Sequence, residues 1–264
     1  MDTIPMTIKN YELISKEIKF LPKSILRLKI LKCLYETPSS MKELNKKANI
    51  EYSAISTNVH KLELEGLLYR KNGKYYLSNK MELYMDNLME LDKITLMLDD
   101  IFPILHNHVV QSIPKYSICS ISTLDGIKLL ESDGLNVYKT YEFIEKSLKH
   151  AKYVNAILPF SYENFNGHFN RLLFNDVDIN LVIPMSIGKI LIKSLDTSKD
   201  NLKLDFFNDD ESNHILLICT DKKMMLGLFK NDGAYDQNRL LVSSNEHSIN
   251  WANNLFENFK KENI

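Results

Sequence analysis

The most constraining feature of the sequence is an Asn-Gly dipeptide at residues 72–73, set between two short runs of Leu and Tyr at residues 67–70 and 75–77. Asn-Gly is a strong signal for a two-residue hairpin, because a type I′ turn needs positive φ at both central positions. We therefore expect two antiparallel strands joined by a tight turn. Arg70, Lys71 and Lys74 surround that turn and make its tip basic.

Three helices are predicted before this hairpin. Ser24 is placed to cap a helix that runs to about residue 35, and the sequence Thr-Pro-Ser-Ser at 37–40 ends it. A short helix over 41–48 follows, and a third over 52–65 ends at Gly66. Three helices followed by a basic hairpin form a winged helix-turn-helix, whose wing contacts the sugar-phosphate backbone of DNA.

The third helix separates into two faces at 100° per residue. Ile55, Val59 and Leu62 lie together and are expected to pack inward. The opposite face is small, polar and nearly free of acid, which lets a helix enter the major groove and reach base edges or phosphates. With the wing, the candidate DNA-binding residues are Tyr52, Ser53, Ser56, Thr57, His60, Lys61, Arg70, Lys71 and Lys74. The alternative is a winged helix used only for protein contacts.

A long helix is predicted over residues 79–102. Six residues along it are spaced 4, 3, 4, 3 and 4 apart, as on the contact face of a coiled coil, and we call this row the seam: Tyr84, Leu88, Leu91, Thr95, Leu98 and Phe102. This pattern predicts a homodimer through the connector; the alternative is a helix buried against the second domain. Pro103 is expected to kink the helix or to start a new one that ends near Val110.

Strands and helices alternate from about residue 114. Strands are predicted at 117–120, 153–158, 177–183, 214–219 and 224–229, and helices at 140–148, 162–173 and 185–195. The nearly continuous apolar run at 214–219 is typical of a central strand covered on both faces. A capping box from Ser243 to Glu246 is expected to begin a last helix that buries Ile249, Ala252, Leu255, Phe256 and Phe259. The alternation predicts an α/β sheet, with ligands outside the carboxyl ends of its strands.

Charge and composition favour two bodies. Residues 1–85 hold 15 Lys and Arg against 9 Asp and Glu, whereas residues 86–264 hold 18 against 25, which suggests a polyanion as partner of the first body. Cys33, Cys119 and Cys219 are widely spaced and fit reduced thiols of a cytoplasmic protein. We see neither a transmembrane segment nor a signal peptide, and His106 and His108 alone make no zinc site.

Two segments carry a resemblance to a known family. The run SILRLKILKCLYETPSSMKELNKKANIEYSAISTNVHKLELEGLLYRKNGKYYLS resembles the head of archaeal winged helix-turn-helix regulators. The tail GAYDQNRLLVSSNEHSINWANNLFENF, residues 233–259, is similar to the C-terminal domain of the archaeal methanogenesis and filament regulator family. The resemblance covers nearly the whole chain. It implies a transcriptional regulator whose α/β sensor is similar to the phospholipase-D-like sensor of archaeal sugar-responsive regulators.

Enzymatic chemistry is not expected. Phospholipase-D-like catalysis needs His-x-Lys followed four residues later by Asp, and after His150 and Lys152 the Asp position holds Ile157. Walker, Rossmann, Gly-x-Ser-x-Gly and His-Glu-x-x-His motifs do not occur. We therefore expect neither catalysis nor a cofactor or metal.

A pocket for a small polar or anionic effector is the better expectation. The chain has four arginines, a side chain suited to clamping carboxylate or phosphate, and two lie in aromatic, amide-rich segments. The candidate effector-binding residues are His168, Arg171, Tyr235, Asp236, Asn238 and Arg239. The structural alternatives are that Arg171 pairs with a nearby Asp, that Asp236 closes a turn, and that Phe165 and Phe169 belong to the core.

These observations predict an α+β fold in three parts: a winged helix-turn-helix DNA-binding domain over 1–78, a connector and dimerisation helix over 79–112, and an α/β sandwich-like effector-sensing domain over 113–264. The predicted function is a transcriptional regulator of double-stranded DNA. Its operator affinity would be modulated by an effector bound to the last domain. The alternative is a winged-helix adaptor for proteins, without sequence-specific DNA binding.

Overall fold

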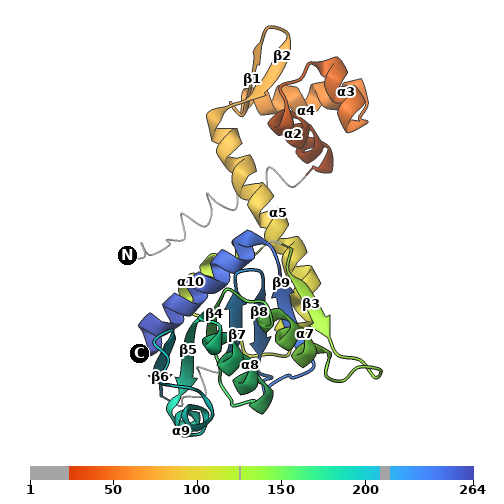
Figure 1. The fold of residues 1–264 in the computed structure, drawn as a ribbon. Helices are drawn as coiled ribbons and strands as arrows, with labels where there is room; N and C mark the ends of the chain where they lie inside the picture. The colour runs from red at the N-terminus through yellow and green to blue at the C-terminus, as the bar shows by residue number, and fades with distance from the viewer. Residues whose placement is uncertain (1–23, 125, 209–214) are drawn as a thin grey trace. The chain divides into compact units, whose positions relative to one another are not determined.

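The computed structural model describes residues 24–124, 126–208 and 215–264. The chain divides into two compact units, Met1–Leu91 and Asp92–Ile264, and the division falls within one long helix, α5 (Figure 1). Each unit is described by itself below. Residues 1–23 of the predicted DNA-binding domain, and His214 of a predicted strand, lie outside the described residues.

The first unit contains the three predicted helices, α2 Ile25–Glu36, α3 Met41–Ala48 and α4 Tyr52–Leu64. The hydroxyl of Ser24 accepts a hydrogen bond from the Arg27 N–H, so the predicted cap of α2 is confirmed. Helix α3 begins with a capping box between Ser40 and Glu43, which satisfies N–H groups that a helix start leaves unpaired. Asn49 adopts a left-handed conformation between α3 and α4, with φ of 52°.

The predicted hairpin is also confirmed, as strands β1 Leu68–Lys71 and β2 Lys74–Leu77 pair antiparallel. Asn72 and Gly73 have φ of 50° and 76°, the positive values that a type I′ turn requires. The side chains of Ile55, Val59 and Leu62 are buried with the inner residues of α2 and the hairpin. These helices and this hairpin form a winged helix-turn-helix.

Helix α5, Asn79–Leu105, contributes to the cores of both units. Met81 and Met85 are buried in the first core, and Ile101 and Ile104 in the second. The expected new helix ending near Val110 is wrong. The helix continues through Pro103 to Leu105, and the next backbone groups then pair with the segment after β8, since the Val109 N–H donates to the Phe229 carbonyl.

The second unit is built on a mixed seven-stranded sheet in the order β3-β9-β8-β7-β4-β5-β6 (Figure 1). Strands β4, β5 and β6 are parallel, and the other pairs are antiparallel. The strands are β3 Lys128–Glu131, β4 Tyr153–Ile157, β5 Asp178–Pro184, β6 Leu202–Phe207, β7 Ile215–Thr220, β8 Met224–Leu228 and β9 Arg239–Ser243. The α-helices that complete the unit are α6 Lys115–Cys119, α7 Lys139–Leu148, α8 Glu163–Phe174, α9 Met185–Ser194 and α10 Glu246–Asn263.

Both faces of the sheet are covered. All six residues of β7 are buried; Leu217 and Cys219 lie in one apolar cluster with α10, and Leu216 and Ile218 in another with α7, α8 and α9. A strand covered on both faces has to be apolar throughout, which explains its sequence and confirms the expectation. The α+β fold class is therefore confirmed. None of the helices within the described ranges is long and apolar enough to cross a membrane.

Two local expectations are wrong. The predicted strand at 117–120 is instead helix α6, where Ser117 is buried and its carbonyl accepts a hydrogen bond from the Trp251 indole of α10. The last helix is capped by Asn245, whose side chain accepts from the His247 N–H, because Ser243 is still part of β9. The apolar residues predicted to be buried by α10 are buried.

Candidate functional site

The outer face of α4 is exposed along its length. Ser53, Ser56, Thr57, His60 and Lys61 are all exposed, and Tyr52 at the helix start is 51% exposed. The Thr57 hydroxyl donates back to the Ser53 carbonyl at 3.0 Å, a common local bond for Thr in a helix. The buried residues of α4 hold the opposite face in the core, so this polar row is presented to solvent by a fixed helix.

The wing presents three cations. Arg70, Lys71 and Lys74 are exposed, and the Arg70 guanidinium lies 5.6 Å from the centre of the Tyr75 ring. Lys74 Nζ lies 3.9 Å from Glu43, a long and exposed ion pair that contributes little. Stacking of Tyr69 on Tyr76, with ring centres 5.4 Å apart, stiffens the strands that carry these charges.

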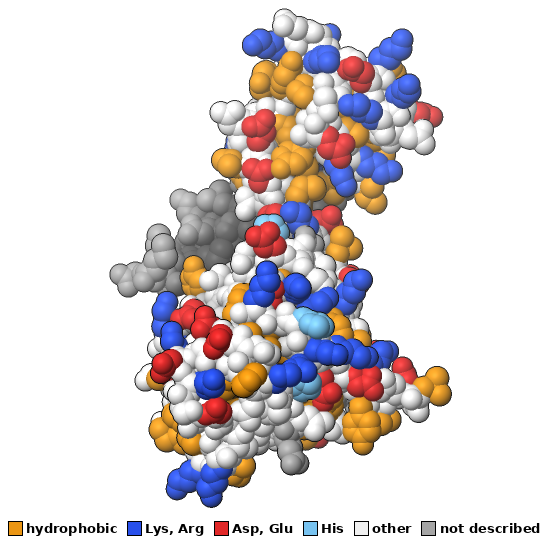
Figure 2. All heavy atoms as spheres, in the orientation of Figure 1, with side chains coloured by type: hydrophobic (Ala, Val, Ile, Leu, Met, Phe, Trp, Pro, Cys, Tyr) orange, Lys and Arg blue, Asp and Glu red, His pale blue; other side chains and the backbone are white. Residues whose placement is uncertain are grey.

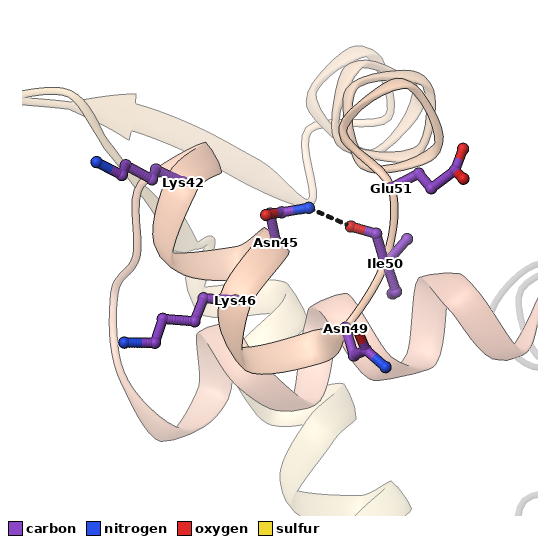
Figure 3. A pocket seen from close by; sticks show the side chains of 6 residues that line it. All are labelled: Lys42, Asn45, Lys46, Asn49, Ile50 and Glu51. Atoms are coloured by element: carbon purple, nitrogen blue, oxygen red, sulfur yellow. Dashed lines mark hydrogen bonds between the residues drawn. The ribbon is translucent and has the colours of Figure 1, made fainter.

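A hollow of ≈ 550 Å³ lies along α3 and the turn that connects α3 to α4 (Figure 3). Asn45 donates from Nδ2 to the Ile50 carbonyl at 2.7 Å and holds the turn that shapes it. Lys42 and Lys46, one helical turn apart, lie on the same side of α3 in Figure 3. Neither lysine is among the DNA-binding residues predicted from the sequence, although their spacing of four places them on one face of a helix.

In the second unit, four of the candidate effector residues lie at the start of β9 or just before it: Tyr235, Asp236, Asn238 and Arg239, of which Asp236 is buried. The His108 Nε2 donates to Asp236 Oδ2 at 2.8 Å, and the two side chains are 0% and 4% exposed. The Nδ1 of His108 contacts the carbonyl of Ile104 in α5. Both ring nitrogens of His108 therefore have a polar partner inside the second unit.

Arg239 also contacts Asp236. Its Nε donates to Glu131 of β3 at 2.8 Å, and its Nη1 lies 3.5 Å from Asp236. The Glu131 carboxylate raises the pKa of Arg239. Asp236 also accepts from the Asn238 N–H at 3.1 Å, which closes a turn. The Arg239 guanidinium therefore has two carboxylate partners, and the turn closed by Asp236 is the one that the structural alternative describes.

Tyr235 faces inward against β8. A Cβ at Gly227 would lie 2.5 Å from the Tyr235 hydroxyl, so only glycine leaves room for this ring. Burial raises the pKa of Tyr235. Its ring packs on Phe160 and Phe229, with centres 4.7 and 5.4 Å apart.

His168 and Arg171 lie on α8. Arg171 is exposed, and its Nη2 lies 3.5 Å from His168 Nδ1, while His168 Nε2 lies 3.9 Å from Glu145 of α7. Phe165 and Phe169 of the same helix are 1% and 0% exposed, so they are core residues.

The N-terminal end of α7 connects the two groups of candidates. The Thr140 hydroxyl donates to the Gln237 carbonyl at 2.6 Å, and the next residue, Tyr141, stacks on Tyr162 with ring centres 4.6 Å apart. The candidates on α8 and beside β9 are thus linked through α7. Within the described ranges, no three His, Cys, Asp or Glu side chains converge as metal ligands would. His108 and Glu131 were missed because 128 and 108 residues separate them from their partners.

A winged helix with an exposed polar helix and a basic hairpin, followed by an α/β unit, is the organisation of a two-domain regulatory protein. Two family models match the chain: Methanogenesis regulatory protein FilR1, N-terminal domain, over residues 15–99, and the middle domain of the same protein over residues 137–262. The chain belongs to this FilR1 family of regulatory proteins.

The chain is 23% identical over 258 residues to the Methanogenesis regulatory protein FilR1 of Methanothrix harundinacea (strain 6Ac). The match covers 92% of this chain and 56% of that relative, so the chain spans little more than half of the relative's length. Among solved structures, the archaeal chromatin protein TrmBL2, whose structure is described as showing a novel mode of DNA binding, is 12% identical. The match to TrmBL2 covers 96% of both chains with a TM-score of 0.42. An IclR-family protein from Rhodococcus sp. is 12% identical, and that match covers 100% of this chain and 98% of the other with a TM-score of 0.19. Neither TM-score establishes a shared overall fold, so the fold assignment rests on the elements described above.

Proposed function

We propose that this chain is a DNA-binding transcriptional regulator whose operator affinity changes when a small molecule binds the second unit. The observation that carries the proposal is the exposed, acid-poor face of α4 in the same unit as a basic hairpin. Short polar side chains on a fixed helix suit base edges in the major groove, and the wing cations suit phosphates. Lys42 and Lys46 extend the backbone contacts, since the helix before the recognition helix crosses the DNA backbone in this motif.

The proposal divides the chain into a DNA-binding domain over residues 1–78, a connector over 79–112 and an effector-binding domain over 113–264. The effector-binding part is supported by the network that joins the buried residues His108 and Asp236 to the half-buried Arg239. This network joins the β9 end of the sheet to the Ile104 carbonyl of α5, and α5 continues into the first unit. A ligand that displaces Asp236 would therefore act directly on the helix that both units share.

We also propose a homodimer through α5. Leu91 and Leu96 are 57% and 61% exposed, and Tyr84, Leu88 and Leu98 of the predicted seam are half-buried. Thr95 is exposed, and the Phe102 side chain lies outside the described residues. Exposed leucines on a long helix suit a symmetric partner, and two symmetric heads would require a pseudo-palindromic operator.

The test of DNA binding is a salt series on the full chain with operator and random duplexes. The triple variant Arg70→Ala, Lys71→Ala, Lys74→Ala should bind both duplexes more weakly, and its salt slope should flatten by about one unit per lost phosphate contact. The matched control removes three exposed lysines of the same unit, Lys29, Lys32 and Lys80. If the wing variant binds random DNA as well as wild type, the proposal is wrong. Salt-independent capture of a protein instead of DNA would favour the adaptor alternative.

A further inference from the structure

A cluster of lysines lies on the surface of the second unit. It consists of the segment 146–152, at the end of α7, and the turn 221–223 between β7 and β8; we refer to these residues as the lysine patch. The Lys152 N–H donates to Asp221 Oδ1 at 2.9 Å, and Lys223 Nζ lies 5.7 Å from the centre of the Phe143 ring of α7. These contacts hold the two segments side by side. Lys and Arg side chains gather over this part of the unit in Figure 2.

The lysine patch is strongly positive for its size. Its ten residues include five lysines and His150 but one acid, Asp221, whereas residues 86–264 as a whole hold more acids than bases. Lys149, Lys152 and Lys222 are exposed, and no ion pair within the described ranges includes any of them. By contrast, Lys146 pairs with Glu142 at 3.5 Å, and Lys260 of α10 pairs with Asp205 at 2.6 Å. The three unpaired ammonium groups leave a local positive potential.

A hollow of ≈ 660 Å³ adjoins the turn of the patch. Lys222 and Lys223 line it together with the polar side chains of Tyr153, Ser244 and Asn250. Lys223 donates to the Ser244 hydroxyl at 2.6 Å, which fixes its ammonium at the rim. Asp221 and Glu246 also line the hollow, so an anion would be held on the lysine side.

We propose that the lysine patch is a second DNA-contact surface, which binds the phosphate backbone and reads no bases. The inference rests on the proposed function, because it assumes that the chain binds DNA. Lysine acts as a flexible point charge, suited to phosphates and poorly suited to base recognition. The cations are spread over two exposed segments instead of converging on one enclosed pocket, which fits the regularly spaced charges of a duplex better than a single small anion.

The test is a salt series with the full chain and the variant Lys149→Gln, Lys152→Gln, Lys222→Gln. Each lost phosphate contact should lower the magnitude of the salt slope by about 0.9, so all three should lower it by about 2.7. Operator and random duplexes should be affected equally. The matched control, Lys115→Gln, Lys128→Gln, Lys189→Gln, removes the same charge from other exposed positions of the unit and should keep the wild-type slope. Circular dichroism melting checks that both variants are folded.

The outcomes separate this inference from the proposed function. If the patch variant keeps the wild-type slope, or if the control loses as much, the patch is not a DNA contact. If the wing variant binds normally while the patch variant does not, the head assignment fails and the patch assignment stands. Pyrophosphate serves as the small-anion probe. If it raises the melting temperature of wild type but not of the patch variant, and the DNA slope of that variant is unchanged, the patch binds small anions and the inference is overturned.

Discussion

The buried pair of His108 and Asp236 makes the sharpest prediction about the second unit. Both side chains are almost fully buried, and His108 Nε2 lies 2.8 Å from Asp236 Oδ2. Asp236→Asn keeps the shape but removes the carboxylate that contacts both His108 and Arg239. Leaving a buried polar group without its partner costs about 1–3 kcal/mol, and more for a charged group.

The upper end of that range applies, because Arg239 loses a carboxylate partner as well. A loss of about 3 kcal/mol corresponds to a fall of roughly 6–12 °C in the melting temperature of a domain of this size. The assay is thermal unfolding without effector, followed by circular dichroism. The double variant His108→Gln, Asp236→Asn should be less destabilised than the sum of the single variants, because the two residues share one contact and its loss counts once.

The control is Asp133→Asn, the same change at an exposed carboxylate that pairs with Lys139 at 3.4 Å. Exposed pairs contribute about 0–1 kcal/mol, so this variant should melt close to wild type. If Asp236→Asn melts at the same temperature as the control, the buried contact between His108 and Asp236 does not stabilise the second unit. The proposed connection between the β9 end of the sheet and α5 would then lose its physical basis.

Three further predictions concern other parts of the chain. Leu91→Lys should convert a dimer to a monomer in light scattering, because it places a charge on an exposed position of the proposed seam. A wild-type protein that is monomeric at tens of micromolar, well above typical regulator affinities, contradicts this prediction. Arg239→Ala should abolish the effector response and leave ligand-free operator affinity intact, while an early melt with a surviving response means that the arginine only neutralises its two carboxylate partners. The Ser40 N–H lowers the pKa of Glu43. This carboxylate therefore stabilises the first unit above the ordinary pKa of Glu, and the stabilisation is lost as pH falls through the lowered pKa. Glu43→Gln should reduce the acid-induced loss of stability seen in melts over that pH range, and an unchanged profile refutes the capping role.

The sequence predicts most of the first unit because its signals are local. A cap at Ser24, a turn at Asn72-Gly73 and a repeat of apolar residues along α4 each depend on neighbours within a few positions. The same holds for β7, whose burial on both faces appears as an uninterrupted apolar run. Local chemistry and final structure agree in these segments.

The sequence fails where long-range packing decides. Strands β3 and β6 lie at the two edges of the sheet and are only partly buried. The short sequence KLLE of β3 gives little strand signal, whereas LKLDFF of β6 alternates apolar and polar residues and could have been predicted. Residues 115–119 become helical where Ser117 meets Trp251, a contact across 134 residues. In the candidate effector region, the partners of Arg239 and Asp236 come from β3 and from the chain after α5, which no local spacing indicates.

The most direct test of the central claim is operator binding by the variant Ser56→Ala, Thr57→Ala, His60→Ala. These side chains are exposed on α4 and contribute nothing to the core, so the fold and the melting temperature should be unchanged. If α4 is the recognition helix, each substitution should cost roughly 1–3 kcal/mol on the operator, and affinity for random DNA should stay at its wild-type value. Equal affinity of variant and wild type for the operator would show that α4 does not read DNA and would contradict the account.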